Sequence, residues 1–141
     1  MNNETKIQSA ILKQLKIWNL LVKRETNQNI RNVNGTIKHM PTDIPGWPDI
    51  IGVLPNGRMF AIEVKTKTGK MSATQKQTRE DLIANNVLHI VATSIDDLTP
   101  IKNELDDCIK NGMKPTPSRS LEIHLVNKSR TWHRKAGLLD R

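Results

Sequence analysis

Apolar residues near the start of the chain recur at spacings of three and four. Ile7, Ile11, Leu15 and Trp18 fall on one side of a helical projection, whereas lysines occupy the other sides. This spacing predicts an amphipathic helix over residues 4–18. Its apolar side should pack against a sheet or against a partner.

Strand-like patterns follow in three places. Residues 20–26 have a short β-like character, and residues 49–54 and 58–65 are two further runs joined by a Pro-Asn-Gly turn. That turn predicts an antiparallel hairpin. The stretch between the first strand and this hairpin is rich in Asn, Gly and Pro, and it predicts a loop or a second hairpin that turns at Asn34-Gly35.

A capping box marks the start of the second predicted helix. Ser72 is followed three positions later by Gln75, so that each side chain can bond the backbone N–H of the other residue. We expect this helix to extend to about Asn85. Residues 87–93 are then a short, nearly continuous apolar run, which is typical of a buried strand.

Helical spacing returns over residues 95–109, with Ser94 as the expected N-cap and an interruption at Pro100. The elements therefore follow the order α, β, β, β, α, β, α. This order predicts an α/β fold in which helices flank a mixed central sheet.

Length and composition bound the class of protein. The 141 residues suffice for one compact domain, expected over residues 1–111, and a basic extension over residues 112–141, in which residues 121–127 could add a strand. No stretch approaches the about 20 consecutive apolar residues of a membrane helix, and the N-terminus lacks an apolar signal core. We therefore expect a cytoplasmic protein, in the host cytoplasm if a phage encodes it. The single Cys108 and the four histidines show no zinc-binding spacing.

The formal net charge of +8 is unevenly distributed. Residues 1–79 hold 13 Lys/Arg and 5 Asp/Glu, residues 80–112 hold 2 and 7, and residues 113–141 hold 7 and 2. The chain is basic at both ends and acidic between them. Neutralisation of phosphates by Lys and Arg drives most non-specific nucleic-acid affinity, so the charge favours a nucleic-acid partner over a merely solvated surface.

Residues 58–65 alternate cleanly, which places Glu63 and Lys65 on the same face of their strand. Taken alone, this pair also suits a solvated edge strand. A hairpin that turns near residue 56 pairs positions whose numbers sum to about 112, so Asp49 should lie across from Glu63. Two carboxylates this close require a compensating cation, and Mg²⁺ prefers such oxygen ligands.

These residues carry a family resemblance. Asp49 after a proline, followed by Glu63-x-Lys65, resembles the signature of the PD-(D/E)xK nucleases, which have the restriction-endonuclease-like fold. The string GWPDIIGVLPNGRMFAIEVKTKTGKMSATQKQ, behind an N-terminal helix with Glu4, resembles the VRR-NUC family within them. The likeness covers roughly residues 3–98 and is greatest to the short stand-alone members of phages and bacteria.

The resemblance implies a metal-dependent DNA endonuclease. Asp49 and Glu63 would hold Mg²⁺, for which Mn²⁺ can substitute, with the backbone carbonyl of Val64 as a further ligand. Lys65 would position or help to deprotonate the attacking water and would stabilise charge on the phosphate.

Two further residues have both a site interpretation and a local one. Gln75 matches the active-site glutamine of the family, where its amide would orient water or a phosphate oxygen; the capping box alone would also explain it. Glu4 matches an acidic residue that contacts the metal directly or indirectly, and it is equally a first-turn acid favoured by the helix dipole.

The expected partners are DNA and a second copy of the chain. The resemblance places Arg31 and Lys38 at basic positions of the DNA-contacting loop, and Lys67 and Lys70 are further candidates for DNA binding. Stand-alone members of the family are similar to Holliday-junction resolvases, which implies a homodimer that acts on branched or four-way DNA. The alternative is a DNA-binding module of the same fold that does not cleave, although such a module has no need of the carboxylate pair.

Overall fold

Helices and strands succeed one another along the part of the chain that the computed structural model describes, namely residues 2–25, 29–31, 35, 37–39 and 44–115. The strands are β1 (Leu21–Arg24), β2 (Asn29–Arg31), β3 (Ile37–His39), β4 (Ile50–Val53), β5 (Met59–Val64) and β6 (Leu88–Ala92). The helices are α1 (Asn3–Ile17), α2 (Ala73–Ala84) and α3 (Thr99–Lys110), with a short 3-10 helix, η1 (Ile95–Leu98), directly before α3. Apart from the β2–β3 pair, this is the predicted order.

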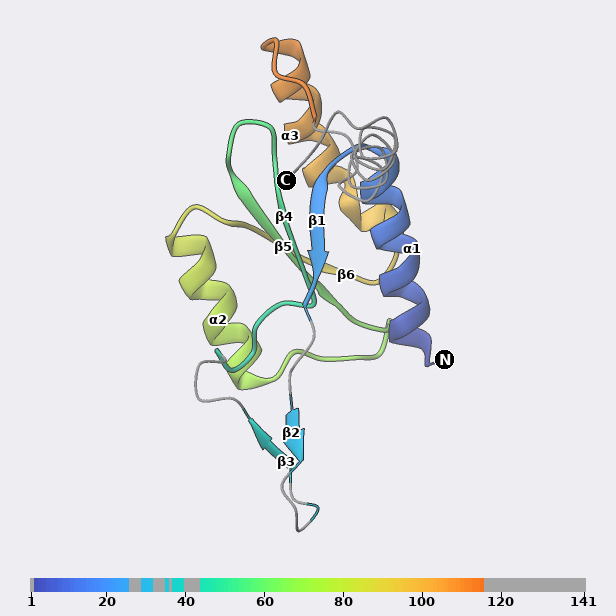
Figure 1. Ribbon diagram of the computed structural model, residues 1–141, viewed down its shortest axis with the longest axis vertical. Coiled ribbons are helices and arrows are strands. Elements are labelled where there is room, and N and C mark those ends of the chain that lie inside the picture. The colour runs from blue at the N-terminus through green and yellow to red at the C-terminus, as the bar shows by residue number, and fades with distance from the viewer. Residues whose placement is uncertain (1, 26–28, 32–34, 36, 40–43, 116–141) are drawn as a thin grey trace, which may run out of the picture.

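The main sheet is mixed and has four strands in the order β1-β4-β5-β6 (Figure 1). The β1–β4 and β4–β5 pairs are antiparallel, whereas β6 lies parallel to β5. A parallel neighbour requires a crossover connection, and α2 supplies it. β5 is therefore a central strand with a neighbour on each side.

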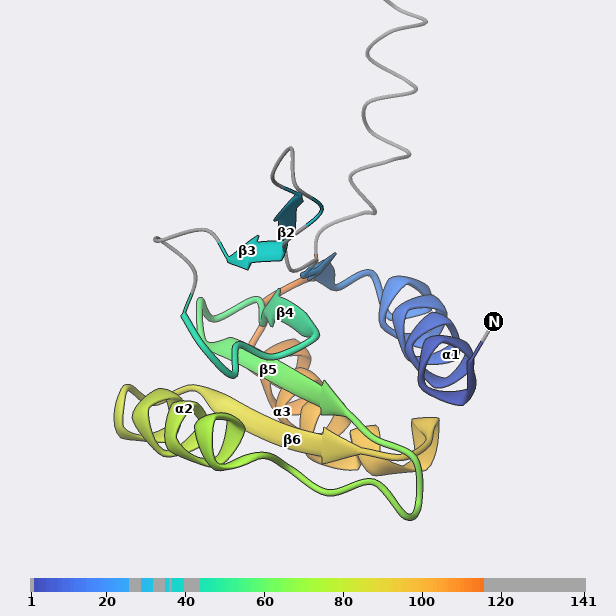
Figure 2. The ribbon, with the colours of Figure 1, turned by 90° about the horizontal axis from the view of Figure 1, so that it is seen from below.

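The two faces of the sheet are covered by different helices, and Figures 1 and 2 show α1 and α2 on opposite sides of it. Alternation along β5 sends Phe60, Ile62 and Val64 into a core shared with α1, η1 and α3. Ala61 faces the other way, into a smaller cluster with Leu82 of α2. The even and odd positions of one strand thus serve two different layers.

The apolar side of α1 covers the sheet. Ile11 and Leu15 are fully buried in the larger core, and Ile7 and Trp18 pack against its margin. The stripe that the spacing predicted is therefore a core face rather than an open surface for a partner.

The β4–β5 hairpin has the predicted register. Ile50 pairs with Ile62 and Val53 pairs with Met59, so the paired numbers sum to 112. The Gly57 N–H donates to the Leu54 carbonyl at 2.8 Å and closes the turn. A slip of one residue would move every side chain to the opposite face, so this turn fixes which residues of β5 face α2.

The segment after β6 differs from its prediction. A 3-10 turn and then α3 replace one interrupted helix, and Pro100 lies in the first turn of α3, where its missing N–H costs nothing. Ser94 precedes η1 but makes no side-chain capping bond, so the expected N-cap is wrong. The Thr93 N–H and hydroxyl instead both donate to the Asp97 carboxylate.

The two basic segments predicted outside the main sheet are described only in part. β2 and β3 form an antiparallel hairpin, so of the predicted loop and the predicted second hairpin the hairpin is present. Asn34, at which this hairpin was predicted to turn, lies outside the described residues. The extension is described only as far as Pro115, so its possible strand over residues 121–127 is not described. Within the described ranges, no helix is long and apolar enough to cross a membrane.

Candidate active site

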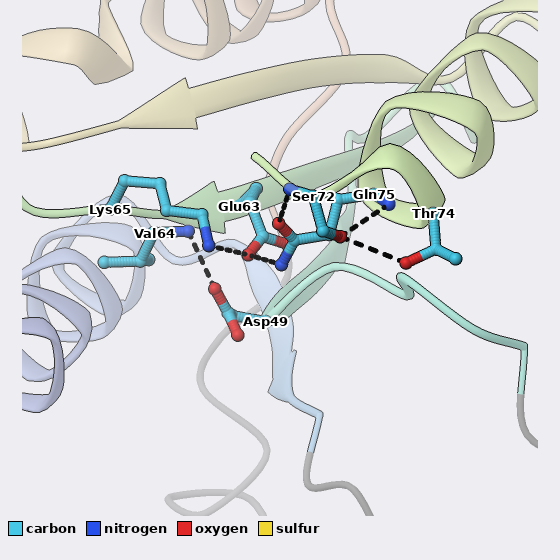
Figure 3. A network of polar contacts seen from close by, with 7 residues as sticks. All are labelled: Asp49, Glu63, Val64, Lys65, Ser72, Thr74 and Gln75. Carbon is cyan, nitrogen blue, oxygen red and sulfur yellow. Dashed lines mark hydrogen bonds and ion pairs between the residues drawn. The ribbon is translucent and has the colours of Figure 1, made fainter. Parts of the chain in front are cut away.

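The hairpin register brings two carboxylates together at one end of β5 (Figure 3). Asp49 precedes Ile50 and Glu63 follows Ile62, and these two isoleucines are paired across the strands. Asp49 and Glu63 therefore occupy the next opposed positions along the hairpin, as the sequence predicted.

Two hydrogen bonds hold Asp49, one to its side chain and one to its backbone carbonyl. Its carboxylate oxygen Oδ2 accepts the backbone N–H of Val64 at 2.8 Å, and its own carbonyl accepts the Glu25 N–H, also at 2.8 Å. The preceding Pro48 is fully buried. The carboxylate thus has a fixed orientation at the junction of β1, β4 and β5.

The role of the Val64 N–H has no signature in the sequence, because any residue other than proline can supply such a donor. Only the strand register could have suggested it.

Glu63 is buried on the face of the sheet that α2 covers. Its side chain is only 3% exposed, and its Oε1 lies 3.5 Å from the Lys65 Nζ, which is itself mostly buried. The prediction that the two share one face is confirmed. The alternative of a solvated charge pair on an edge strand is wrong, because β5 lies between β4 and β6.

Gln75 serves α2 and the carboxylate at once. Its side-chain oxygen accepts the Ser72 N–H at 2.9 Å, and its own N–H is capped by the Ser72 hydroxyl at 3.1 Å. Because the amide oxygen is thereby occupied, the amide nitrogen faces Glu63 and donates to Oε1 at 2.8 Å. The capping box is confirmed, and the same side chain reaches the predicted site.

The environment changes the acidity of this pair. Burial, followed by repulsion from the Asp49 carboxylate, raises the pKa of Glu63 to about 8, although the Lys65 ammonium acts in the opposite direction. Without a further cation, this shift favours the protonated form of Glu63. A divalent cation that binds both carboxylates would take the place of that proton.

The donor set suits a hard cation. One oxygen of each carboxylate, Asp49 Oδ1 and Glu63 Oε2, accepts no N–H from the described residues. Two adjacent carboxylates, each with an oxygen that accepts no N–H from these residues, fit Mg²⁺, which prefers oxygen ligands and retains several waters.

Glu4 is not brought to this pair by any described contact. It lies in the first turn of α1, where the helix dipole favours an acid. Across the described ranges, His, Cys, Asp and Glu side chains nowhere gather in a group of three or more that could hold a metal. The site therefore rests on two carboxylates.

The expected DNA-contacting residues lie in two places. Lys67 and Lys70 are exposed on the loop between β5 and α2, directly after Lys65. Arg31 and Lys38 lie on β2 and β3, where each is paired with an isoleucine of the other strand. Figure 1 shows this hairpin beyond the end of the main sheet at which β1 ends.

Comparison with known proteins supports the fold assignment. The chain is similar to a solved structure described as a VRR_NUC domain, with a TM-score of 0.50 and 19% sequence identity over 78% of this chain and 97% of that one. A second structure, described as a VRR_NUC domain protein, has a TM-score of 0.47 and 19% identity over 74% of this chain and 88% of that one. No protein-family model matches the chain, and no curated protein matches it. The structural similarity to a VRR_NUC domain over most of the chain confirms the predicted fold class.

Proposed function

We propose that the chain is a metal-dependent nuclease of the VRR-NUC type that hydrolyses phosphodiester bonds in DNA. One observation carries the proposal: Asp49 and Glu63 lie side by side at the end of a central strand, with Lys65 against Glu63. A solvated ion pair needs no such arrangement, because placing a buried carboxylate, Glu63, beside a second, half-buried one, Asp49, is costly unless a cation compensates them. The fold similarity to a VRR_NUC domain is consistent with this chemistry.

The carboxylates of Asp49 and Glu63 would hold Mg²⁺ or Mn²⁺, with the Val64 carbonyl as a further oxygen ligand. When bound, the ion would supply Lewis-acid stabilisation of the phosphate and a nucleophilic water near neutral pH. The Val64 N–H keeps Asp49 oriented for this role. Glu4 would contact the metal directly or indirectly, and Glu4→Gln tests whether it contributes.

Lys65 would act on the substrate side of the site. Its ammonium is a compact point charge paired with Glu63. It would lie near the scissile phosphate, offset developing negative charge and help to deprotonate the attacking water. Gln75 would keep Glu63 Oε1 in place while its backbone stays anchored in the capping box.

DNA would approach over the loop that carries Lys67 and Lys70, with Arg31, Lys38 and the basic extension adding phosphate contacts. One site of this kind cuts one strand. We therefore propose a homodimer that places two sites across branched or four-way DNA, and that reads DNA shape rather than sequence. Since the apolar side of α1 is in the core, the dimer interface would use another surface.

The deciding experiment is incubation of the purified protein with supercoiled plasmid in Mg²⁺, in Mn²⁺ and in EDTA. We expect nicking that depends on the metal and that Lys65→Ala abolishes, whereas Lys102→Ala on α3 serves as the charge-matched control. Absence of nicking with either metal would favour the non-cleaving DNA-binding module. Linear, flapped, forked and four-way substrates, together with light scattering, then test the branched-DNA and homodimer proposals. A monomer near 16.0 kDa that cuts linear and four-way DNA equally would refute both.

A further inference from the structure

A tight turn leads into Asp49. The Trp47 N–H donates to the Ile44 carbonyl at 3.2 Å, with Pro45 and Gly46 as the two central residues. Gly46 has a φ of +74°, a backbone conformation that residues with a side chain rarely adopt. Proline followed by a glycine of positive φ is typical of a type II turn.

This turn also packs directly against the first turn of α2. A Cβ on Gly46 would lie 2.4 Å from the Thr74 carbonyl oxygen and 2.6 Å from the Gln75 nitrogen, which no real side chain tolerates. One turn further along α2, the buried Thr78 hydroxyl donates to the Pro45 carbonyl at 2.6 Å. Two adjacent residues of the turn therefore hold two successive turns of the helix.

The contact between this turn and α2 lies at Gln75, the residue of α2 that bonds Glu63. α2 follows a loop in which residues 67–70 are exposed. Gln75 has to present its amide to Glu63 at hydrogen-bond distance. Because Gly46 abuts the Gln75 backbone, the turn determines how far this residue lies from β5.

We propose that Gly46 and Thr78 are positioning residues: they fix the first turn of α2 so that Gln75 holds the Glu63 carboxylate beside Asp49. Their catalytic consequence rests on the proposed nuclease function. A type II turn alone would explain a glycine at position 46. It would not explain why the Thr74 and Gln75 backbone lies so close to this glycine, or why the Thr78 hydroxyl bonds the Pro45 carbonyl.

Thr78→Val is the main test, because valine keeps the shape and removes the hydroxyl. We expect kcat to fall about 10-fold while KM for DNA stays within about 2-fold, since misplacement of a supporting group weakens the transition state more than binding. Thr78→Ser should restore kcat to within about 2-fold of the original. If Thr78→Val does not fold, Thr78→Ala is measured in its place.

Glycine variants supply a matched control. Gly57 has a φ of +87°, and a Cβ added to it would meet no atom within 4 Å, so Gly57→Ala introduces the same backbone strain without the contact. Gly46→Ala should lower kcat by about 10²-fold, whereas Gly57→Ala should leave it within about 2-fold.

A double variant separates positioning from general stability. In a Gln75→Ala background, Thr78→Val should add less than about 2-fold to the loss of kcat, because both changes act through the same side chain. Independently of activity, the side-chain amide NMR signals of Gln75 should shift or broaden in Thr78→Val and remain in place in Gly57→Ala.

An unchanged kcat in folded Thr78→Val, a full additional loss in the Gln75→Ala background, or unshifted Gln75 amide signals would each overturn the proposal. If the unsubstituted protein cleaves no DNA, the proposed function has failed, and the NMR comparison alone decides whether the turn positions Gln75.

Discussion

The two faces of the central sheet bury different kinds of side chains. Among the residues that the structure describes, the face toward α1 and α3 buries fourteen apolar side chains in one continuous cluster. The face toward α2 buries three of the described apolar side chains in its cluster, together with the polar residues Glu63, Thr78 and His89. Both faces share β5, whose successive side chains point alternately to each.

The difference separates stability from chemistry. Apolar burial supplies most of the free energy of folding, so the α1/α3 face holds the sheet rigid. The α2 face can then contain a buried carboxylate, although its pKa is far from the ordinary value. Residues one position apart on β5 should therefore respond very differently to substitution.

Phe60→Ala tests the apolar face. The ring is fully buried, and its removal should lower the free energy of unfolding by about 3–5 kcal/mol. Leu82→Ala, in the smaller cluster behind α2, should cost about 2 kcal/mol. Urea denaturation measures both, and equal losses would contradict the asymmetry between the faces.

Glu63→Gln and Lys65→Ala test the polar face. Each should reduce the rate of DNA cleavage by at least about 10²-fold, the usual cost of losing one transition-state contact. DNA affinity should remain largely intact, because phosphate contacts elsewhere dominate it. Gel-based nicking and fluorescence anisotropy measure the two effects. Cleavage by Lys65→Ala at the original rate would show that the site is wrongly assigned.

His89 gives the α2 face a pH dependence. Burial, and to a lesser extent Arg79, lowers the pKa of His89 from its ordinary value of 6.5 to about 4, and its Nδ1 finds no hydrogen-bond partner among the described residues. Between these pH values the unfolded chain binds a proton that the folded chain does not. The free energy of unfolding should therefore decrease by roughly 1–3 kcal/mol as the pH falls from 6.5 to 4.

His89→Gln removes this titration, so the difference between the two proteins isolates it from other groups, including Glu63. Thermal denaturation at pH 7 and pH 4.5 is sufficient. An equal loss of stability in both proteins would show that His89 is protonated in the folded state.

Truncation before Lys114 tests the basic extension. It removes 7 Lys/Arg and 2 Asp/Glu, which should weaken DNA binding and flatten its dependence on salt while turnover at saturating DNA is retained. Binding isotherms at several salt concentrations measure this effect. Loss of folding instead would show that residues 121–127 form part of the core.

Local patterns were sufficient to predict several of these features. The Pro-Asn-Gly turn set the register of the β4–β5 hairpin, and alternation along β5 placed Glu63 and Lys65 on one face. The capping box of Ser72 and Gln75 also formed as predicted. Each of these depends on residues close together in the sequence, so neighbouring side chains and backbone geometry decide them.

Other features arise only when distant segments meet. The sequence did not reveal that β6 pairs with β5 and so makes β5 central, which is why an edge-strand interpretation of Glu63 remained open. Ser94 has a favourable residue type for a cap, but Asp97 takes the local hydrogen bonds. Gly46 was visible as part of a motif, yet its contact with Thr74 depends on where α2 packs. Burial and backbone approach depend on the whole fold, because long-range packing determines which groups lose contact with water.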